Sequence, residues 1–125
     1  MASGTAEPGR RRVLIVDDHP SFRASARRLL EGEGYEVVGE AADGAEALRC
    51  ASEVDPDVVL LDVRLPDLDG FAVSRRITGR PGAPAVILIS SREVDEWGGA
   101  VADAGARGFI SKADLSADAM EALLG

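Results

Sequence analysis

The residues of this chain that could do chemistry stand at the ends of short apolar runs. In chain order they are Asp17, Asp18, Asp62, Ser90 and Lys112. A short run rich in Val, Leu and Ile is typical of a strand that is buried on both faces. Parallel strands end at the same edge of their sheet, where open α/β sheets bind their ligands. We therefore expect these five side chains to lie close together.

The three carboxylates predict a cation site. Carboxylates that share one cleft repel each other unless they are protonated or bind a cation. Mg²⁺ prefers oxygen ligands, is bound through one or two carboxylates, and often bridges them to phosphate. Asp17, Asp18 and Asp62 are therefore interpreted as a site for Mg²⁺, or for Mn²⁺ in its place.

Lys112 and Ser90 extend this prediction to a phosphoryl group. Lys112 is the single lysine among 14 basic residues. As a cation it does not suit a metal site, but it can neutralise phosphoryl oxygens, to which the Ser90 hydroxyl can donate a hydrogen bond. A carboxylate can act as a nucleophile and form an aspartyl phosphate. The central carboxylate, Asp62, is the expected acceptor.

The surrounding pattern alternates strands with helices. Strands are expected over 13–16, 35–40, 58–61, 85–89 and 108–111, and helices over about 22–32, 43–52, 71–78, 92–104 and 115–124. Helix-length connections predict a parallel sheet that is covered on both faces. Asp18 or Ser21 is expected to cap the first helix, and Asp43 the second.

Composition limits the function classes. A chain of 125 residues fits one domain, expected over 12–125, after a disordered lead-in over 1–11. The net charge of −8 argues against direct nucleic-acid binding. Cys50 is the only cysteine, no apolar run is long enough to span a membrane, and residues 1–9 lack a secretory signal. A cytoplasmic protein without a membrane partner is expected.

These motifs resemble those of the receiver domains of two-component response regulators, over residues 12–124. The resemblance rests on Asp17-Asp18, Asp62, Leu65-Pro66, Asp69-Gly70, Ser90, Phe109 and Lys112. It implies a single flavodoxin-like (βα)5 domain with the strand order 2-1-3-4-5. The family often has Pro after the lysine; this chain has Ala113, for which a trans peptide bond is expected.

The resemblance also assigns roles. It implies that Asp62 accepts a phosphoryl group from a histidine kinase or a phosphotransfer protein, and that the backbone carbonyl of Arg64 joins the carboxylates around Mg²⁺. Lys112 would pair with the phosphoryl group. Ser90 and Phe109 would change the face made by the fourth helix, fifth strand and fifth helix. A downstream protein or an output domain of the same protein would read that face, and a homodimer is left open.

Three other functions compete with this one. An aspartate-nucleophile phosphatase would have a second acid two residues after its nucleophile, where this chain has Arg64. No enzymatic activity is expected beyond transfer of a phosphoryl group to Asp62 and its hydrolysis from that residue. A nucleotide-binding module would need a phosphate-binding Gly-rich loop, which the sequence lacks. A degenerate receiver that acts as a docking module without phosphorylation is the alternative.

Three residues near the predicted site have more than one possible role. Arg64 and Arg92 stand two residues beyond Asp62 and Ser90. They are either modulators that slow attack of water on the phosphorylated aspartate or solvated side chains. His19 is a loop residue, a metal ligand or a phosphate carrier.

Overall fold

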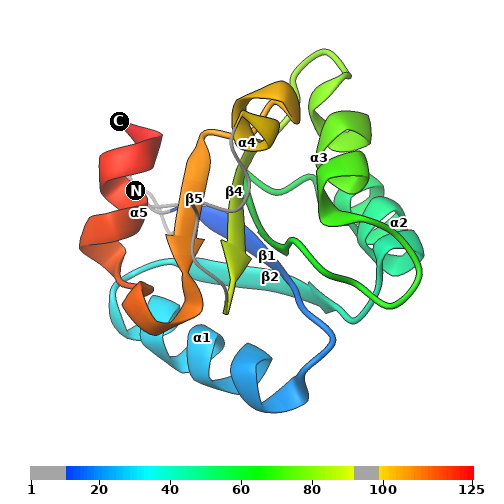
Figure 1. Ribbon diagram of the computed structural model, residues 1–125. Helices are drawn as coiled ribbons and strands as arrows, with labels where there is room; N and C mark the ends of the chain where they lie inside the picture. The colour runs from blue at the N-terminus through cyan, green and yellow to red at the C-terminus, as the bar shows by residue number, and fades with distance from the viewer. Residues whose placement is uncertain (1–10, 92–98) are drawn as a thin grey trace, which may run out of the picture.

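The computed structural model describes residues 11–91 and 99–125. They form a five-stranded parallel sheet in the order β2-β1-β3-β4-β5 (Figure 1). The strands are β1 (Arg12–Val16), β2 (Glu36–Ala41), β3 (Val58–Asp62), β4 (Ala85–Ser90) and β5 (Gly108–Ser111). The predicted fold class and strand order are confirmed.

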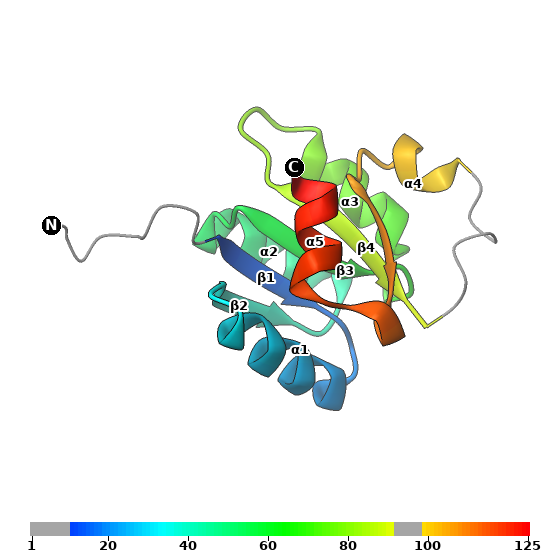
Figure 2. The same ribbon diagram turned by 90° about the vertical axis from the view of Figure 1, so that its left-hand side faces the viewer.

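Helices cover both faces of this sheet, as predicted. They are α1 (Pro20–Gly32), α2 (Gly44–Val54), α3 (Gly70–Thr78), α4 (Ala100–Asp103) and α5 (Ala117–Leu124), with a 3-10 turn at Lys112–Asp114. Helices α1 and α5 pack on one face, and α2, α3 and α4 on the other (Figures 1 and 2). Among the described residues, no helix combines the length and the apolar character needed to cross a bilayer.

The core follows from the alternation of side chains along each strand. In β3, Val59 and Leu61 pack toward α2 and α3, whereas Val58 and Leu60 pack toward α1 and α5. All four are fully buried, because β3 is the central strand of the sheet. Burying an apolar side chain of this size contributes about 1.5–3 kcal/mol. The sheet is therefore a rigid platform for the side chains at its carboxyl edge.

The start of α1 differs from the prediction. Its N-cap is His19, and Pro20 is the first helical residue. Ser21 lies inside the helix, and Asp18 precedes the cap. Proline fits the first helical position because its backbone nitrogen has no hydrogen to leave unpaired. The predicted caps Asp18 and Ser21 are therefore wrong.

The starts of α2, α3 and α5 have side-chain caps. Asp43 accepts a hydrogen bond from the backbone N–H of Glu46 at 2.8 Å, as predicted. Ser116 accepts one from Ala119 at 3.0 Å at the start of α5. The predicted fourth helix is described only in part, as Ala100–Asp103, because residues 92–98 lie outside the described ranges. The Lys112–Ala113 peptide bond is trans.

Candidate functional site

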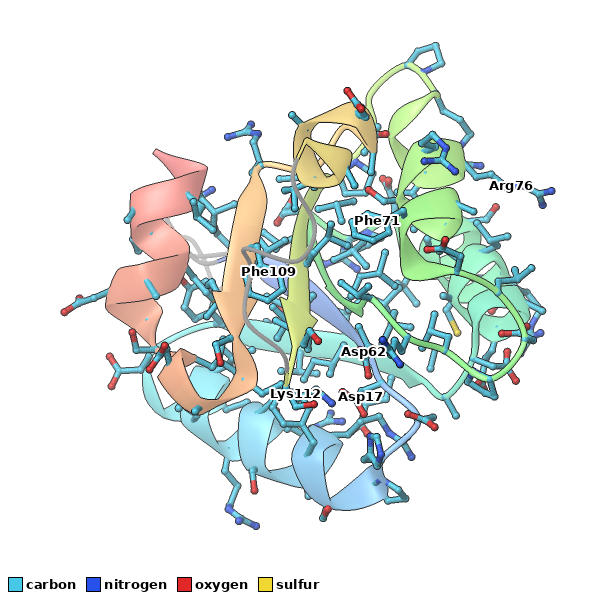
Figure 3. All side chains as sticks on the ribbon, viewed as in Figure 1. Asp17, Asp62, Phe71, Arg76, Phe109 and Lys112 are labelled. Atoms are coloured by element: carbon cyan, nitrogen blue, oxygen red, sulfur yellow. The ribbon has the colours of Figure 1, made fainter. Side chains whose placement is uncertain are left out.

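Three predicted site residues meet at the carboxyl edge of the sheet. Asp17 follows β1, Asp62 ends β3, and Lys112 follows β5. Figure 3 shows their side chains pointing toward one another. Asp17 is fully buried, and Asp62 is 4% exposed. Their charges therefore interact more strongly than charges in bulk water.

Lys112 is held by contacts from three elements. Its Nζ lies 2.5 Å from Asp17 Oδ2 and donates a hydrogen bond to Asp62 Oδ2 at 3.2 Å. The same ammonium lies 4.7 Å from the centre of the Phe22 ring in α1. Burial alone would lower the pKa of Lys112, but the two carboxylates outweigh it and raise the pKa. The lysine therefore remains charged.

The two buried carboxylates share this lysine unequally. Burial opposes ionisation of Asp17, but the ion pair with Lys112 and the hydrogen bonds from His19 outweigh it and lower its pKa. Burial raises the pKa of Asp62, and repulsion from Asp17 adds to the effect. The backbone N–H of Arg64 and the more distant Lys112 offset this only in part. Asp62 is therefore the carboxylate that lacks full neutralisation.

The donor set fits a hard divalent cation. Ligand atoms of Asp17, Asp18, His19 and Asp62 lie within 4.8 Å of one another. Asp17 Oδ2 is buried and accepts no well-directed hydrogen bond from the described residues, although it is paired with Lys112. Three carboxylates beside one ammonium leave negative charge to be balanced. Carboxylate oxygens in such a cluster suit Mg²⁺ or Mn²⁺.

A shallow cavity of about 250 Å³ opens above this cluster. Asp18, His19, Asp62, Arg64, Ser90 and Lys112 are among the residues that line it. The carboxylate of Asp62 is oriented by the backbone N–H of Arg64, which donates to Oδ1 at 3.0 Å. Ser90 is the last residue of β4 and pairs in register with Ser111, directly before Lys112. The cavity therefore brings together five of the predicted site residues.

One predicted residue lies elsewhere among the described residues. Phe109 is half-buried in β5 and packs against the core beneath α2, α3 and α4, away from the acidic cluster (Figure 3). Arg92 lies outside the described residues.

The segment from the loop after Asp62 to the start of α3 adds two residues whose contacts were not predicted from the sequence. Asp67 accepts hydrogen bonds from the backbone N–H groups of Gly44 and Ala45 at 2.7 and 3.0 Å, so it caps α2 from a distant loop. A side chain at Gly70 would place its Cβ 2.3 Å from the carbonyl oxygen of Asp62. The motif Asp69-Gly70 pointed to Gly70, but no local signal pointed to the contact of Asp67.

Known proteins share this architecture. The family model of the response regulator receiver domain matches residues 13–124. A solved two-component response regulator of the LuxR family from Aurantimonas sp. SI85-9A1 has a TM-score of 0.84 and 36% identity, covering 93% of this chain and 86% of that one. The solved signal receiver domain of NarL from Mycobacterium tuberculosis has a TM-score of 0.81 and 34% identity, covering 93% and 98%.

Curated relatives are longer than this chain. The transcriptional regulatory protein PdtaR of Mycobacterium tuberculosis is 38% identical over 115 residues, which are 90% of this chain and 55% of that protein. This chain spans about half the length of several curated relatives and 23% of another. The family match covers almost all described residues, and the solved receivers share the fold. The chain therefore belongs to the response regulator receiver domains of two-component signalling systems.

Proposed function

We propose that this receiver is a switch that accepts a phosphoryl group on Asp62 from the phosphohistidine of a sensor kinase or phosphotransfer protein. The observation that carries the proposal is the placement of Lys112 against Asp17 and Asp62 at the floor of an open cavity. A cation fixed beside a carboxylate is what a phosphoryl acceptor needs, because phosphoryl transfer depends mainly on positioning and charge neutralisation.

In the proposed step, a carboxylate oxygen of Asp62 forms a bond to phosphorus. The bond from phosphorus to the donor's imidazole nitrogen breaks, and its electron pair stays on that nitrogen. The N–H of Arg64 holds the acceptor carboxylate in one orientation. Lys112 neutralises a phosphoryl oxygen, and the Ser90 hydroxyl donates a hydrogen bond to another.

Asp17, Asp18, Asp62 and the backbone carbonyl of Arg64 would hold Mg²⁺ or Mn²⁺. When bound, the ion would offset the charge of the carboxylates and of the phosphoryl oxygens. The raised pKa of Asp62 supports a bound cation here, because the chain itself does not fully offset the negative charge of this carboxylate.

The output is a change in the face made by α4, β5 and α5. Phe109 of β5 pairs in register with Leu88, which stands two residues before Ser90 on the adjacent strand β4. A shift of Ser90 toward a phosphoryl group therefore starts close to Phe109. We propose that Phe109 transmits the shift of Ser90 to the face made by α4, β5 and α5. A downstream protein or an output domain of the same protein would bind this face. The same face would also serve as the interface of a homodimer.

The cellular setting belongs to the same proposal. The net charge of −8 favours a protein partner over direct binding to nucleic acid. The chain would act in the cytoplasm, where a sensor kinase has its phosphohistidine, and without binding the membrane. The only reactions of the chain would be transfer of a phosphoryl group to Asp62 and hydrolysis of the phosphorylated Asp62.

Arg64 and Arg92 are assigned as modulators of the lifetime of phosphorylated Asp62. Arg64 lines the cavity and is exposed. Its side chain can shield the phosphoryl group from water. Alanine at each position should shorten the lifetime, measured as the loss of phosphoprotein after the donor is removed. An unchanged lifetime in both variants would remove this assignment.

The test of the main proposal is incubation with Mg²⁺ and acetyl phosphate, followed by intact-mass measurement. One phosphoryl group should be added to the native chain and none to Asp62→Asn. Asp57→Asn is the matched control, because Asp57 is exposed and stands just before β3, at its opposite end. It should be modified like the native chain. Absence of any adduct in the native chain would favour a docking module without phosphorylation.

A further inference from the structure

His19 is the only histidine of the chain, and its ring lies against the acidic pair. Its Nδ1 is 2.9 Å from Asp17 Oδ1 and 3.1 Å from Asp18 Oδ1. The side chain is 63% exposed. Burial therefore does not force the ring into this position, in which it contacts both acids.

The backbone explains why the ring points this way. Pro20 favours an extended conformation in the residue before it, and His19 has φ −101° and ψ 109°. The backbone N–H of His19 also donates to Asp17 Oδ1 at 2.8 Å. As the N-cap of α1, His19 makes no side-chain hydrogen bond to the helix. The ring is directed at the carboxylates instead.

The ring nitrogen belongs to the same compact ligand set as the carboxylates. One atom each from Asp17, Asp18, His19 and Asp62 falls within 4.8 Å of the others. Two ligand atoms on opposite sides of a cation at about 2.1 Å are about 4.2 Å apart. A small contraction therefore brings all four to coordinating distance.

The chemistry of this nitrogen differs from that of the carboxylates. Imidazole nitrogen suits first-row transition ions, whereas Mg²⁺ prefers oxygen ligands. We infer that His19 Nδ1 is a ligand in the cation site and makes it bind transition dications more tightly than carboxylates alone would. The inference rests on the proposed function, since the same carboxylates hold the ion. Coordination requires the neutral ring with its proton on Nε2.

The alternative role of His19 is purely to orient the acids by hydrogen bonds. The two roles have different consequences. An orienting residue supports every ion that the acids bind, so its loss weakens Mg²⁺ and Co²⁺ alike. A ligating residue supports Co²⁺ and leaves Mg²⁺ almost unchanged.

The test uses untagged protein with Cys50→Ser, which removes the only thiol of the chain. Titration calorimetry with Co²⁺ and with Mg²⁺ compares this background with His19→Ala. We expect His19→Ala to weaken Co²⁺ binding by about 10-fold or more, as loss of a metal-site residue commonly does, and to change Mg²⁺ binding by less than about 2-fold. Ser21→Ala is the matched control on the same turn and should bind both ions normally.

Pulsed electron paramagnetic resonance with Mn²⁺ adds a direct readout. The ion should show coupling to an imidazole nitrogen, and ¹⁵N labelling of histidine alone should change that signal. Absence of the coupling, or an equal loss of Co²⁺ and Mg²⁺ affinity in a folded His19→Ala chain, would overturn the inference and leave the magnesium site standing. Failure of the native chain to bind any of these ions would overturn both.

Discussion

The ammonium of Lys112 lies 4.7 Å from the centre of the Phe22 ring while it contacts the carboxylates of Asp17 and Asp62. The ring provides the apolar side of a pocket whose other sides are acidic. A cation over an aromatic face is attracted by the negative charge density of the ring, and this attraction strengthens as water is removed. The Lys112 side chain is 15% exposed. Phe22 is therefore part of what positions the lysine.

Replacing Phe22 by Leu should slow phosphorylation of Asp62 by acetyl phosphate. We expect a fall of about threefold to tenfold, because a partly desolvated cation–π contact is worth on the order of 1 kcal/mol. Phe22→Tyr keeps an aromatic face and should restore the rate. The rate is measured by intact mass over time, with thermal unfolding as the control for folding. Equal rates in native, Leu and Tyr chains would contradict a positioning role for Phe22.

Asp62→Asn should stabilise the folded chain in the absence of divalent cations. Burial raises the pKa of Asp62, so its ionisation at neutral pH opposes folding. We expect a gain on the order of 1 kcal/mol in the free energy of unfolding, measured with urea in EDTA at pH 7. Mg²⁺ should stabilise the native chain more than the variant, because the ion binds the folded state.

The pH dependence of this gain has a defined sign. The pKa of Asp62 is higher in the folded than in the unfolded state, so folding takes up protons between the two values. The contribution of Asp62 to stability is present below about pH 4 and is lost as the pH rises through the folded pKa. The difference between Asp62→Asn and the native chain should therefore grow from about pH 4 toward neutrality. A difference that stays constant with pH would contradict this cause.

Asp67→Ala should loosen the start of α2. Hydrogen bonds from the N–H groups of Gly44 and Ala45 lower the pKa of Asp67. The contribution of Asp67 to stability is therefore present above about pH 4 and is lost as the pH falls through its lowered pKa. We expect a lower unfolding temperature at pH 7 and faster hydrogen exchange at the two amides, measured by NMR. Glu53→Ala, at the other end of α2, is the control and should leave both amides protected.

Gly70→Ala should destabilise the chain strongly. The added Cβ would lie 2.3 Å from the carbonyl oxygen of Asp62, so the backbone must move. Overpacking of this kind costs about 1–3 kcal/mol. Gly32→Ala is the control, because nothing lies within 4 Å of a Cβ at the end of α1. Urea unfolding measures the free energy of unfolding of both variants. Equal stability of the two would contradict the prediction, because it would mean that the backbone at Gly70 moves without loss of stability.

Much of the fold could be predicted because each strand is a short apolar run that ends at a polar residue. That pattern placed Asp17, Asp62, Ser90 and Lys112 at one edge, and the structure gathers them there. The start of α1 was misplaced because Asp18 and Ser21 are good capping residues. Pro20 was the better signal, since proline favours the first helical position and so makes His19 the cap.

The details of the site could not be predicted, because they depend on loop conformations. Residue type alone does not reveal that Lys112 lies closer to Asp17 than to Asp62. Nor does it reveal that Asp67 reaches across 23 positions to Gly44. Both contacts follow from how the loops after β5 and β3 leave the sheet.

The contacts of Lys112 also have a thermodynamic consequence. Fixing a lysine side chain in one conformation costs up to about 2 kcal/mol of entropy. Here that ordering takes place when the domain folds, because Asp17, Asp62 and Phe22 already hold the ammonium. A phosphoryl donor therefore meets a preorganised lysine. The contacts with Asp17 and Phe22 serve both the readiness of the site and the stability of the domain, so a substitution that weakens either of these two contacts lowers both.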